Sequence, residues 1–143
     1  MRPPSTVCPQ LKVQMWDLNA PGAILGSLVG HTKQVYSVQL DSANPHRICS
    51  GGGEGTVRLW DTRTLAATSS LQAHVSAVMC VHIQDHRVIT GGNDNNLKVF
   101  DLRTNRCLSQ LEDHSGAIFS VSAFSIFFIF SILFLYLLYL YAP

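Results

Sequence analysis

An aromatic residue followed by aspartate recurs three times along the chain at a nearly constant spacing. The three pairs are separated by 44 and 40 residues, and a histidine follows each pair after 14 or 15 residues. A period of about 40 residues is typical of repeat proteins in which each unit is one supersecondary motif that buries its apolar face against its neighbours. The pairs are Trp16-Asp17, Trp60-Asp61 and Phe100-Asp101, and the histidines are His31, His74 and His114.

Between these landmarks the sequence predicts short antiparallel strands, because apolar and polar residues alternate and glycine-rich turns interrupt them. Glycine and asparagine in the turns 51–55 and 91–95 supply the positive φ angles that tight hairpins need. The expected fold class is therefore all-β. Inner strands are expected at 36–40 and 78–83, second strands at 48–50 and 88–90, third strands ending at Trp60 and Phe100, and outer strands at about 66–71 and 106–111.

These units resemble WD40 repeats, with Gly30-His31 opening one unit and Trp60-Asp61 closing it after 28 intervening residues. The resemblance covers about residues 11 to 121 and implies a partial β-propeller with two complete four-stranded blades. The first blade lacks its two inner strands, and a fourth ends after its first strand. We expect an N-terminal flexible segment at 1–10, repeats at about 22–61 and 65–101, and partial blades at 11–29 and 114–121.

The resemblance also implies that a buried chain of polar side chains holds each blade together, since buried polar atoms need hydrogen-bond partners. In one of these polar chains Glu54 replaces the family's aspartate, and its longer side chain is expected to reach His31 less well. Phe100 removes the indole donor from the other, so Thr90 must find another partner or lose about 1 kcal/mol. The chains comprise Trp60, Ser50, His31 and Glu54 in one blade, and Thr90, His74 and Asp94 in the next.

The serine, histidine and acidic residues could also suggest a hydrolase. Recurrence at the repeat period and the lack of a G-x-S-x-G motif argue instead for a structural role and against an enzyme. The run 51–55 lacks the Gly-Lys-Ser/Thr ending of a phosphate loop. Four separated cysteines without a C-x-x-C pair predict neither zinc nor any other cofactor. A net charge of +1 gives no argument for nucleic acid.

Each complete repeat closes on an aromatic-Asp-x-Arg sequence. The segments 48–63 and 88–103 resemble the sixteen-residue box by which some WD-repeat proteins dock onto the damage-binding adaptor of cullin ubiquitin ligases. The resemblance implies that Arg63 and Arg103, next to Asp61 and Asp101, present forked donors to that adaptor. The alternative is that each arginine only stabilises its own hairpin. A ligase role through an F-box in a missing N-terminal region is a further alternative.

The last thirty residues carry no charged side chain, whereas the first 113 carry all nineteen. Residues 123–142 include thirteen Phe, Ile or Leu residues among twenty and are long enough to span a bilayer as a helix. The apolar tail 122–143 is thus either a membrane anchor or the ending of an alternative or intron-derived transcript. Its start in the middle of a blade favours the second interpretation, and lack of period-2 alternation argues against a buried strand.

Taken together, these patterns predict a non-catalytic scaffold that binds other proteins. The repeat region is expected in the cytoplasm or nucleus, or at a membrane if the tail is an anchor. Two blades and two fragments leave an apolar face open at each end, because a propeller closes with four to eight blades. We therefore expect the isolated chain to be marginal or aggregation-prone unless it associates with itself or with a partner.

Overall fold

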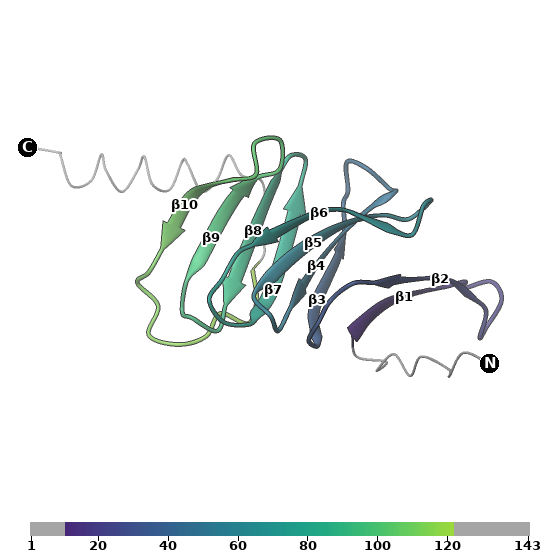
Figure 1. The fold of residues 1–143 in the computed structure, drawn as a ribbon, viewed down its shortest axis with the longest axis horizontal. Coiled ribbons are helices and arrows are strands. Elements are labelled where there is room, and N and C mark those ends of the chain that lie inside the picture. Colours follow the sequence, from purple (N-terminus) through teal and green to yellow (C-terminus); the bar gives the residue numbers. More distant parts are fainter. Residues whose placement is uncertain (1–10, 122–143) are drawn as a thin grey trace, which may run out of the picture.

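The computed structural model describes residues 11–121, which form ten strands in three antiparallel sheets (Figure 1). Within this range there is no α-helix, so the all-β fold class is confirmed. The strands are β1 (Lys12–Trp16), β2 (Ile24–Val29), β3 (Val35–Leu40), β4 (Arg47–Gly52), β5 (Thr56–Asp61), β6 (Ala66–Gln72), β7 (Val78–Gln84), β8 (Arg87–Gly92), β9 (Leu97–Asp101) and β10 (Arg106–Leu111).

Two of the sheets are four-stranded meanders in which each strand pairs with the next along the chain. Their strand orders are β3-β4-β5-β6 and β7-β8-β9-β10, and β1 and β2 form a separate two-stranded sheet. We call the β1–β2 pair the first blade, β3–β6 the second blade and β7–β10 the third blade. Within residues 11–121 these sheets match the expected partial propeller, in which the first blade contributes two strands.

Positive φ angles occur in the hairpin turns, mostly at glycine and asparagine. Gly55 and Asn95 occupy equivalent places before β5 and β9, with φ angles of +85° and +64°. Asn105 has φ +53° in the β9–β10 turn, where the second blade has Leu65 at φ +57°. Leucine rarely adopts this region, but the Leu65 side chain packs against Gly26 of the first blade. That contact places the leucine across the junction between two blades.

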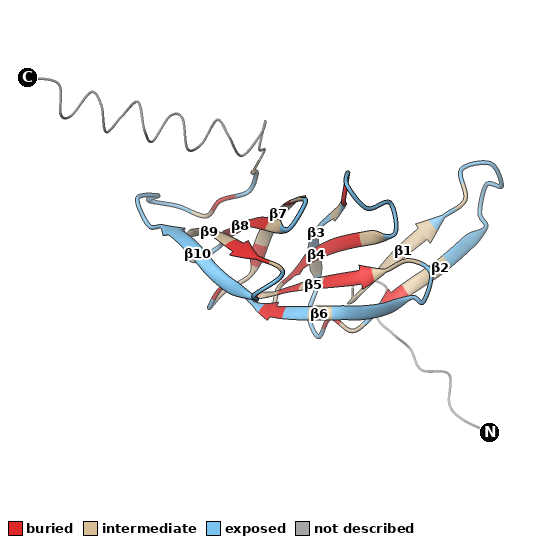
Figure 2. Ribbon diagram, turned by 90° about the horizontal axis from the view of Figure 1, so that it is seen from above, coloured by how far each residue is buried: buried red, intermediate tan, exposed pale blue. Residues whose placement is uncertain are grey.

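The core lies between the second and third blades, where the sheets stack face to face (Figure 2). In the second and third blades the second strands, β4 and β8, are the most deeply buried, and the outer strands β6 and β10 are largely exposed. Cys49, Val57, Val78 and Val88 are each at most 1 % exposed within this core. A smaller cluster of Leu28, Ile48 and Trp60 joins the first blade to the second.

After β10 the described chain forms no further strand, which differs from the expected first strand of a fourth blade. A strand requires a neighbour with which to form a hydrogen-bond ladder, and no described residue pairs in this way with 117–121. Ile118 nevertheless packs against the third blade, because its backbone N–H donates to the Gly92 carbonyl at 3.1 Å. This segment therefore takes the place of a next blade without completing one.

The expected flexible segment at 1–10 and the apolar tail at 122–143 lie outside the described residues, so both interpretations of the tail stay predictions. Among residues 11–121, the structure contains no helix of sufficient length and apolarity to cross a membrane.

Candidate functional site

In the second blade, the predicted polar side chains form one continuous hydrogen-bonded chain. The Trp60 indole N–H donates to Ser50 Oγ at 2.8 Å, and Ser50 Oγ lies 2.7 Å from His31 Nε2. Because an indole N–H can only donate, the serine hydroxyl proton is left for His31 Nε2. His31 is then the Nδ1–H tautomer, and it donates from Nδ1 to the Glu54 carboxylate. The hydrogen bonds thus all donate in one direction, from the Trp60 indole to the Glu54 carboxylate.

Glu54 reaches the histidine fully, contrary to the expectation from its longer arm. Two further donors hold the carboxylate in place: the Thr56 hydroxyl at 2.6 Å and the Lys33 backbone N–H at 3.1 Å. Burial by itself would raise the pKa of Glu54. Hydrogen bonds from Thr56 and His31 lower the pKa by more than burial raises it, so the pKa of Glu54 lies below its ordinary value. The carboxylate is therefore ionised at neutral pH and suited to accept the histidine proton.

The third blade keeps the same chain without the indole. His74 Nε2 lies 2.8 Å from Thr90 Oγ1, and His74 Nδ1 lies 2.8 Å from Asp94 Oδ1. Thr90 Oγ1 is also 3.4 Å from the Lys98 carbonyl, so its hydroxyl has two acceptors within reach although Phe100 offers no donor. The hydroxyl proton is therefore satisfied, and only the acceptor capacity that an indole would fill is left unused.

Acid should destabilise the third blade in two steps. Burial lowers the pKa of His74 below 6.5 although Asp94 opposes the shift. The pKa of Asp94 is also below its ordinary value, because the contact with His74 outweighs burial. In both cases the unfolded chain binds more protons than the folded chain as the pH falls. Stability is thus complete above pH 6.5, declines below it through His74, and declines again below 3.8 through Asp94.

Thermal unfolding of the full chain between pH 7.5 and 3 tests this expectation, together with an NMR titration of the His74 ring. His74→Gln should flatten the first decline, because glutamine does not titrate, whereas Asp94→Asn should leave a decline that starts near pH 6.5. A His74 pKa above its ordinary value would contradict the assignment of a neutral ring.

The chain of Ser50, His31 and Glu54 has the connectivity of a hydrolytic triad, but its surroundings do not fit catalysis. Ser50 is 0 % exposed, and its oxygen already accepts the Trp60 N–H. A nucleophile must reach its substrate, and this hydroxyl is enclosed on every side. Burial likewise raises the pKa of the Cys49 thiol to about 12, so this cysteine is unreactive. These buried residues hold the blades together.

The exposed arginines predicted as partner-binding residues lie in equivalent turns of two consecutive blades. In the β5–β6 turn, Asp61 Oδ1 accepts the backbone N–H of Arg63 at 2.9 Å, and Arg63 Nη2 donates to Asp61 Oδ2 at 2.7 Å. In the β9–β10 turn, Asp101 Oδ1 accepts the backbone N–H of Arg103 at 2.8 Å, and Arg103 Nη2 donates to Asp101 Oδ2 at 3.5 Å. The structure therefore brings each predicted Asp–Arg pair together within its own turn.

The aspartates stay ionised because of these contacts. The Arg63 side chain and backbone N–H lower the pKa of Asp61 to about 2. The Arg103 backbone N–H and guanidinium also lower the pKa of Asp101. The arginine side chains remain 67 % and 68 % exposed, so much of each guanidinium faces solvent. The first blade has the same turn around Asp17, with Asn19 in place of the arginine.

Two polar residues that sequence reasoning missed join the second and third blades. Ser37 Oγ accepts the Val81 backbone N–H at 3.1 Å, and Gln39 Oε1 accepts the Ile83 backbone N–H at 3.2 Å. Both acceptors lie on β3, two residues apart, and therefore face the same side. The available signal was a polar residue at every second position of an otherwise apolar strand.

Four-stranded antiparallel sheets that stack face to face and carry this buried polar chain define a repeat protein of the β-propeller class. The chain belongs to the WD-repeat family. The family model described as WD domain, G-beta repeat matches residues 22–61 and 66–101, which together make up more than half of the chain.

Curated relatives match parts of the repeat region. A ribosome biogenesis protein WDR12 homolog from Drosophila willistoni is 42 % identical over 50 residues, covering 35 % of this chain and 11 % of the relative. Protein SPA1-RELATED 3 from Arabidopsis thaliana is 32 % identical over 69 residues, which are 48 % of this chain and 8 % of the relative. A guanine nucleotide-binding protein subunit beta from Solanum tuberosum is 43 % identical over 53 residues, which are 36 % of this chain and 14 % of the relative. The chain thus spans about a tenth of the length of these relatives.

These findings support a coarse functional statement. WD-repeat domains generally act as non-catalytic scaffolds that bind other proteins, and this chain has the repeats of such a scaffold. Because one fold serves many assemblies, the partner has to be argued from the exposed residues themselves.

Proposed function

We propose that the repeat region serves as part of a substrate receptor of a cullin-type ubiquitin ligase and docks onto the ligase adaptor through Arg63 and Arg103. The main supporting observation is that both arginines are highly exposed and are oriented by an aspartate of their own turn. A guanidinium that is already positioned loses less conformational freedom on binding a carboxylate or carbonyl group. Two such groups in consecutive blades offer a repeated contact for one partner.

The pairing with Asp61 also fits the alternative in which the arginine only stabilises its hairpin. The two roles differ in what Arg63→Ala should change. The turn itself uses the backbone N–H of residue 63, which alanine retains. An exposed ion pair contributes little to stability. Removal of the side chain should therefore leave the fold intact and affect only binding.

We expect Arg63→Ala to weaken binding of the full chain to the purified adaptor by about 10-fold or more, which corresponds to the loss of one charge-assisted hydrogen bond. Arg63→Lys should weaken binding as well, because lysine lacks the forked geometry. Arg106→Ala is the matched control, since Arg106 is exposed on β10 outside the Asp-x-Arg turns. Isothermal titration calorimetry measures the three variants. If the wild-type chain shows no binding to the adaptor, or all three variants bind like wild type, the proposal is wrong.

A further inference from the structure

The β3–β4, β5–β6, β7–β8 and β9–β10 turns lie at the same end of the second and third blades (Figure 1). Within each blade, the turn between the first two strands is bonded to the Asp-x-Arg turn. The His46 carbonyl accepts the Thr62 N–H at 2.9 Å, and the His86 carbonyl accepts the Leu102 N–H at 2.8 Å. In both blades the donor is the residue directly before the exposed arginine. The β3–β4 and β7–β8 turns therefore hold the backbone beside the two arginines.

Arg47 joins the turns of the second blade to those of the third. It is the first residue of β4, directly after His46, and its Nη2 donates to the Asp85 carbonyl in the β7–β8 turn. His86 follows Asp85 in that turn. One Asp-x-Arg turn is thus connected to the other by a continuous series of hydrogen bonds, two within the blades and one between them.

A buried carboxylate holds the Arg47 guanidinium in place. Asp41 is 2 % exposed, and its Oδ2 accepts the Arg47 Nε–H at 2.6 Å. Asp41 Oδ1 also accepts the Ala43 N–H at 2.9 Å, and Asn44 Oδ1 accepts the His46 N–H at 3.0 Å. Water competes little for a buried ion pair, so this contact orients the guanidinium well. Arg47 therefore points to the third blade before any partner binds.

Arg47 differs from the two exposed arginines in what its hydrogen bonds connect. Arg63 and Arg103 donate to the aspartates of their own turns, and their side chains are 67 % and 68 % exposed. The Arg47 side chain is 23 % exposed and bonds to groups of both blades. Its place thus suits a residue that sets the positions of other groups rather than one that contacts a partner.

We infer that Arg47 joins the two Asp-x-Arg turns into one docking surface, on which a single partner contacts Arg63 and Arg103 at the same time. The inference rests on the proposed function, which supplies the partner, the ligase adaptor. That partner presents two acceptor oxygens, from carboxylate or carbonyl groups, one for each guanidinium. A fixed spacing between the two guanidinium groups favours binding, because the first contact already places the second. Arg47 is a positioning residue of this surface.

The distance between the two Asp-x-Arg turns can be measured in the free chain by pulsed electron paramagnetic resonance. Thr64 and Thr104 are exposed and directly follow the two arginines, so Thr64→Cys/Thr104→Cys carries one nitroxide label in each turn. Cys8→Ser and Cys107→Ser prevent labelling at those cysteines, and Cys49 and Cys80 are buried. The wild-type background should give a narrow distance distribution.

Arg47→Lys should broaden this distribution. Lysine keeps a positive charge beside Asp41 but lacks the forked group that also reaches the Asp85 carbonyl. Asp85→Asn is the matched control, because the acceptor is a backbone carbonyl and asparagine tolerates the φ angle of +55°. The control also removes a charge from the same surface and should leave the distribution narrow. Equal distributions for the wild-type background and Arg47→Lys would overturn the inference.

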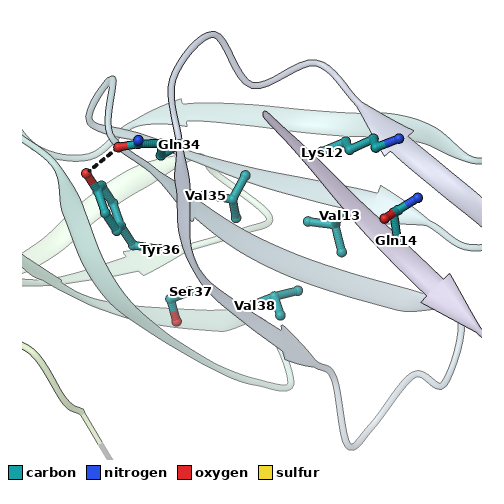
Figure 3. Close-up of a pocket in the computed structure, with 8 residues that line it drawn as sticks. All are labelled: Lys12, Val13, Gln14, Gln34, Val35, Tyr36, Ser37 and Val38. Carbon is teal, nitrogen blue, oxygen red and sulfur yellow. Dashed lines mark hydrogen bonds between the residues drawn. The ribbon is translucent and has the colours of Figure 1, made fainter. Parts of the chain in front are cut away.

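Binding to the purified adaptor, measured by isothermal titration calorimetry with the full chain, gives a second readout. Arg47→Lys should weaken binding by about 5-fold or more. In an Arg103→Ala chain the same change should have no further effect, because no second arginine is left to position. Asp85→Asn should bind like wild type. So should Lys12→Ala, which removes a cation from the groove between 12–14 and 34–38, at the start of β1 and away from the four turns (Figure 3).

The two readouts distinguish a failure of this inference from a failure of the proposed function. If the wild-type chain does not bind the adaptor but Arg47→Lys broadens the distance distribution, the partner is wrong and the joined surface stands. If Arg63→Ala weakens binding while Arg47→Lys changes neither binding nor the distribution, the proposed function stands and the inference is wrong. Equal weakening by Arg47→Lys in the wild-type and Arg103→Ala chains would show a general structural role and would also overturn it. Circular dichroism checks that each variant is folded.

Discussion

Replacement of Gly55 by alanine should lower the free energy of unfolding by roughly 2–5 kcal/mol, which combines a left-handed backbone cost of about 1–2 kcal/mol with overpacking of about 1–3 kcal/mol. Gly55 has φ +85°, and an added methyl group would lie 2.2 Å from the His74 carbonyl oxygen. The Gly55 carbonyl also accepts the N–H groups of Ala73 and His74, each at 3.0 Å. The substitution therefore strains the turn and displaces the segment that leads into the third blade.

Gly22→Ala separates the two contributions. Gly22 has nearly the same φ angle, +86°, but an added methyl group would have no neighbour within 4 Å. Gly22→Ala should therefore lower the free energy of unfolding only by the cost of the left-handed backbone, about 1–2 kcal/mol. Urea unfolding followed by circular dichroism measures both variants. Equal losses at the two positions would show that the close approach of Gly55 to His74 does not contribute.

Loss of the central hydroxyl of the second blade should have a comparable effect. Ser50→Ala removes the acceptor of the Trp60 N–H and the donor to His31 Nε2. Each buried polar group left without a partner costs about 1–3 kcal/mol, so the expected loss is roughly 2–6 kcal/mol. The change in volume is small, and the effect therefore reports mainly on hydrogen bonding.

Thr90→Val is the matched change in the third blade. It removes the hydroxyl partner of His74 Nε2. No indole N–H loses its acceptor, because Phe100 occupies the position that Trp60 has in the second blade. The expected loss is about 1–3 kcal/mol. The same urea titrations compare the two variants. A loss for Thr90→Val as large as that for Ser50→Ala would contradict the role given to the Trp60 N–H.

Several local features could be predicted from the residues alone. The outer strands were expected at 66–71 and 106–111, and they run over Ala66–Gln72 and Arg106–Leu111. The two histidines His31 and His74 were assigned to their hydroxyl and carboxylate partners, and the structure brings all of them together. The strand predictions succeeded because apolar and polar residues alternate along each strand. The histidine partners were predicted correctly because the resemblance to WD40 repeats assigns them residue by residue.

Other features depend on distances that a repeat pattern does not contain. The reach of Glu54 was underestimated because Thr56 and Lys33 hold its carboxylate, and these contacts follow from the turn geometry. The exposed arginines could be identified, but their ion pairs with Asp61 and Asp101 required side-chain positions. Ser37 and Gln39 were missed because their hydrogen bonds join residues 44 positions apart in different sheets.

The sequence by itself determined the short antiparallel strands and their order, because these follow from a period of about 40 residues and from alternation along each strand. The members of the polar chains followed from the resemblance of these repeats to WD40 repeats. Only the tertiary structure decided which faces are covered. Val38 and Val81 are the same residue at the same strand position, yet one is 52 % exposed and the other 5 %. Burial depends on the neighbouring sheet rather than on the residue, and among residues 11–121 that neighbour is present for β7 and absent for β3.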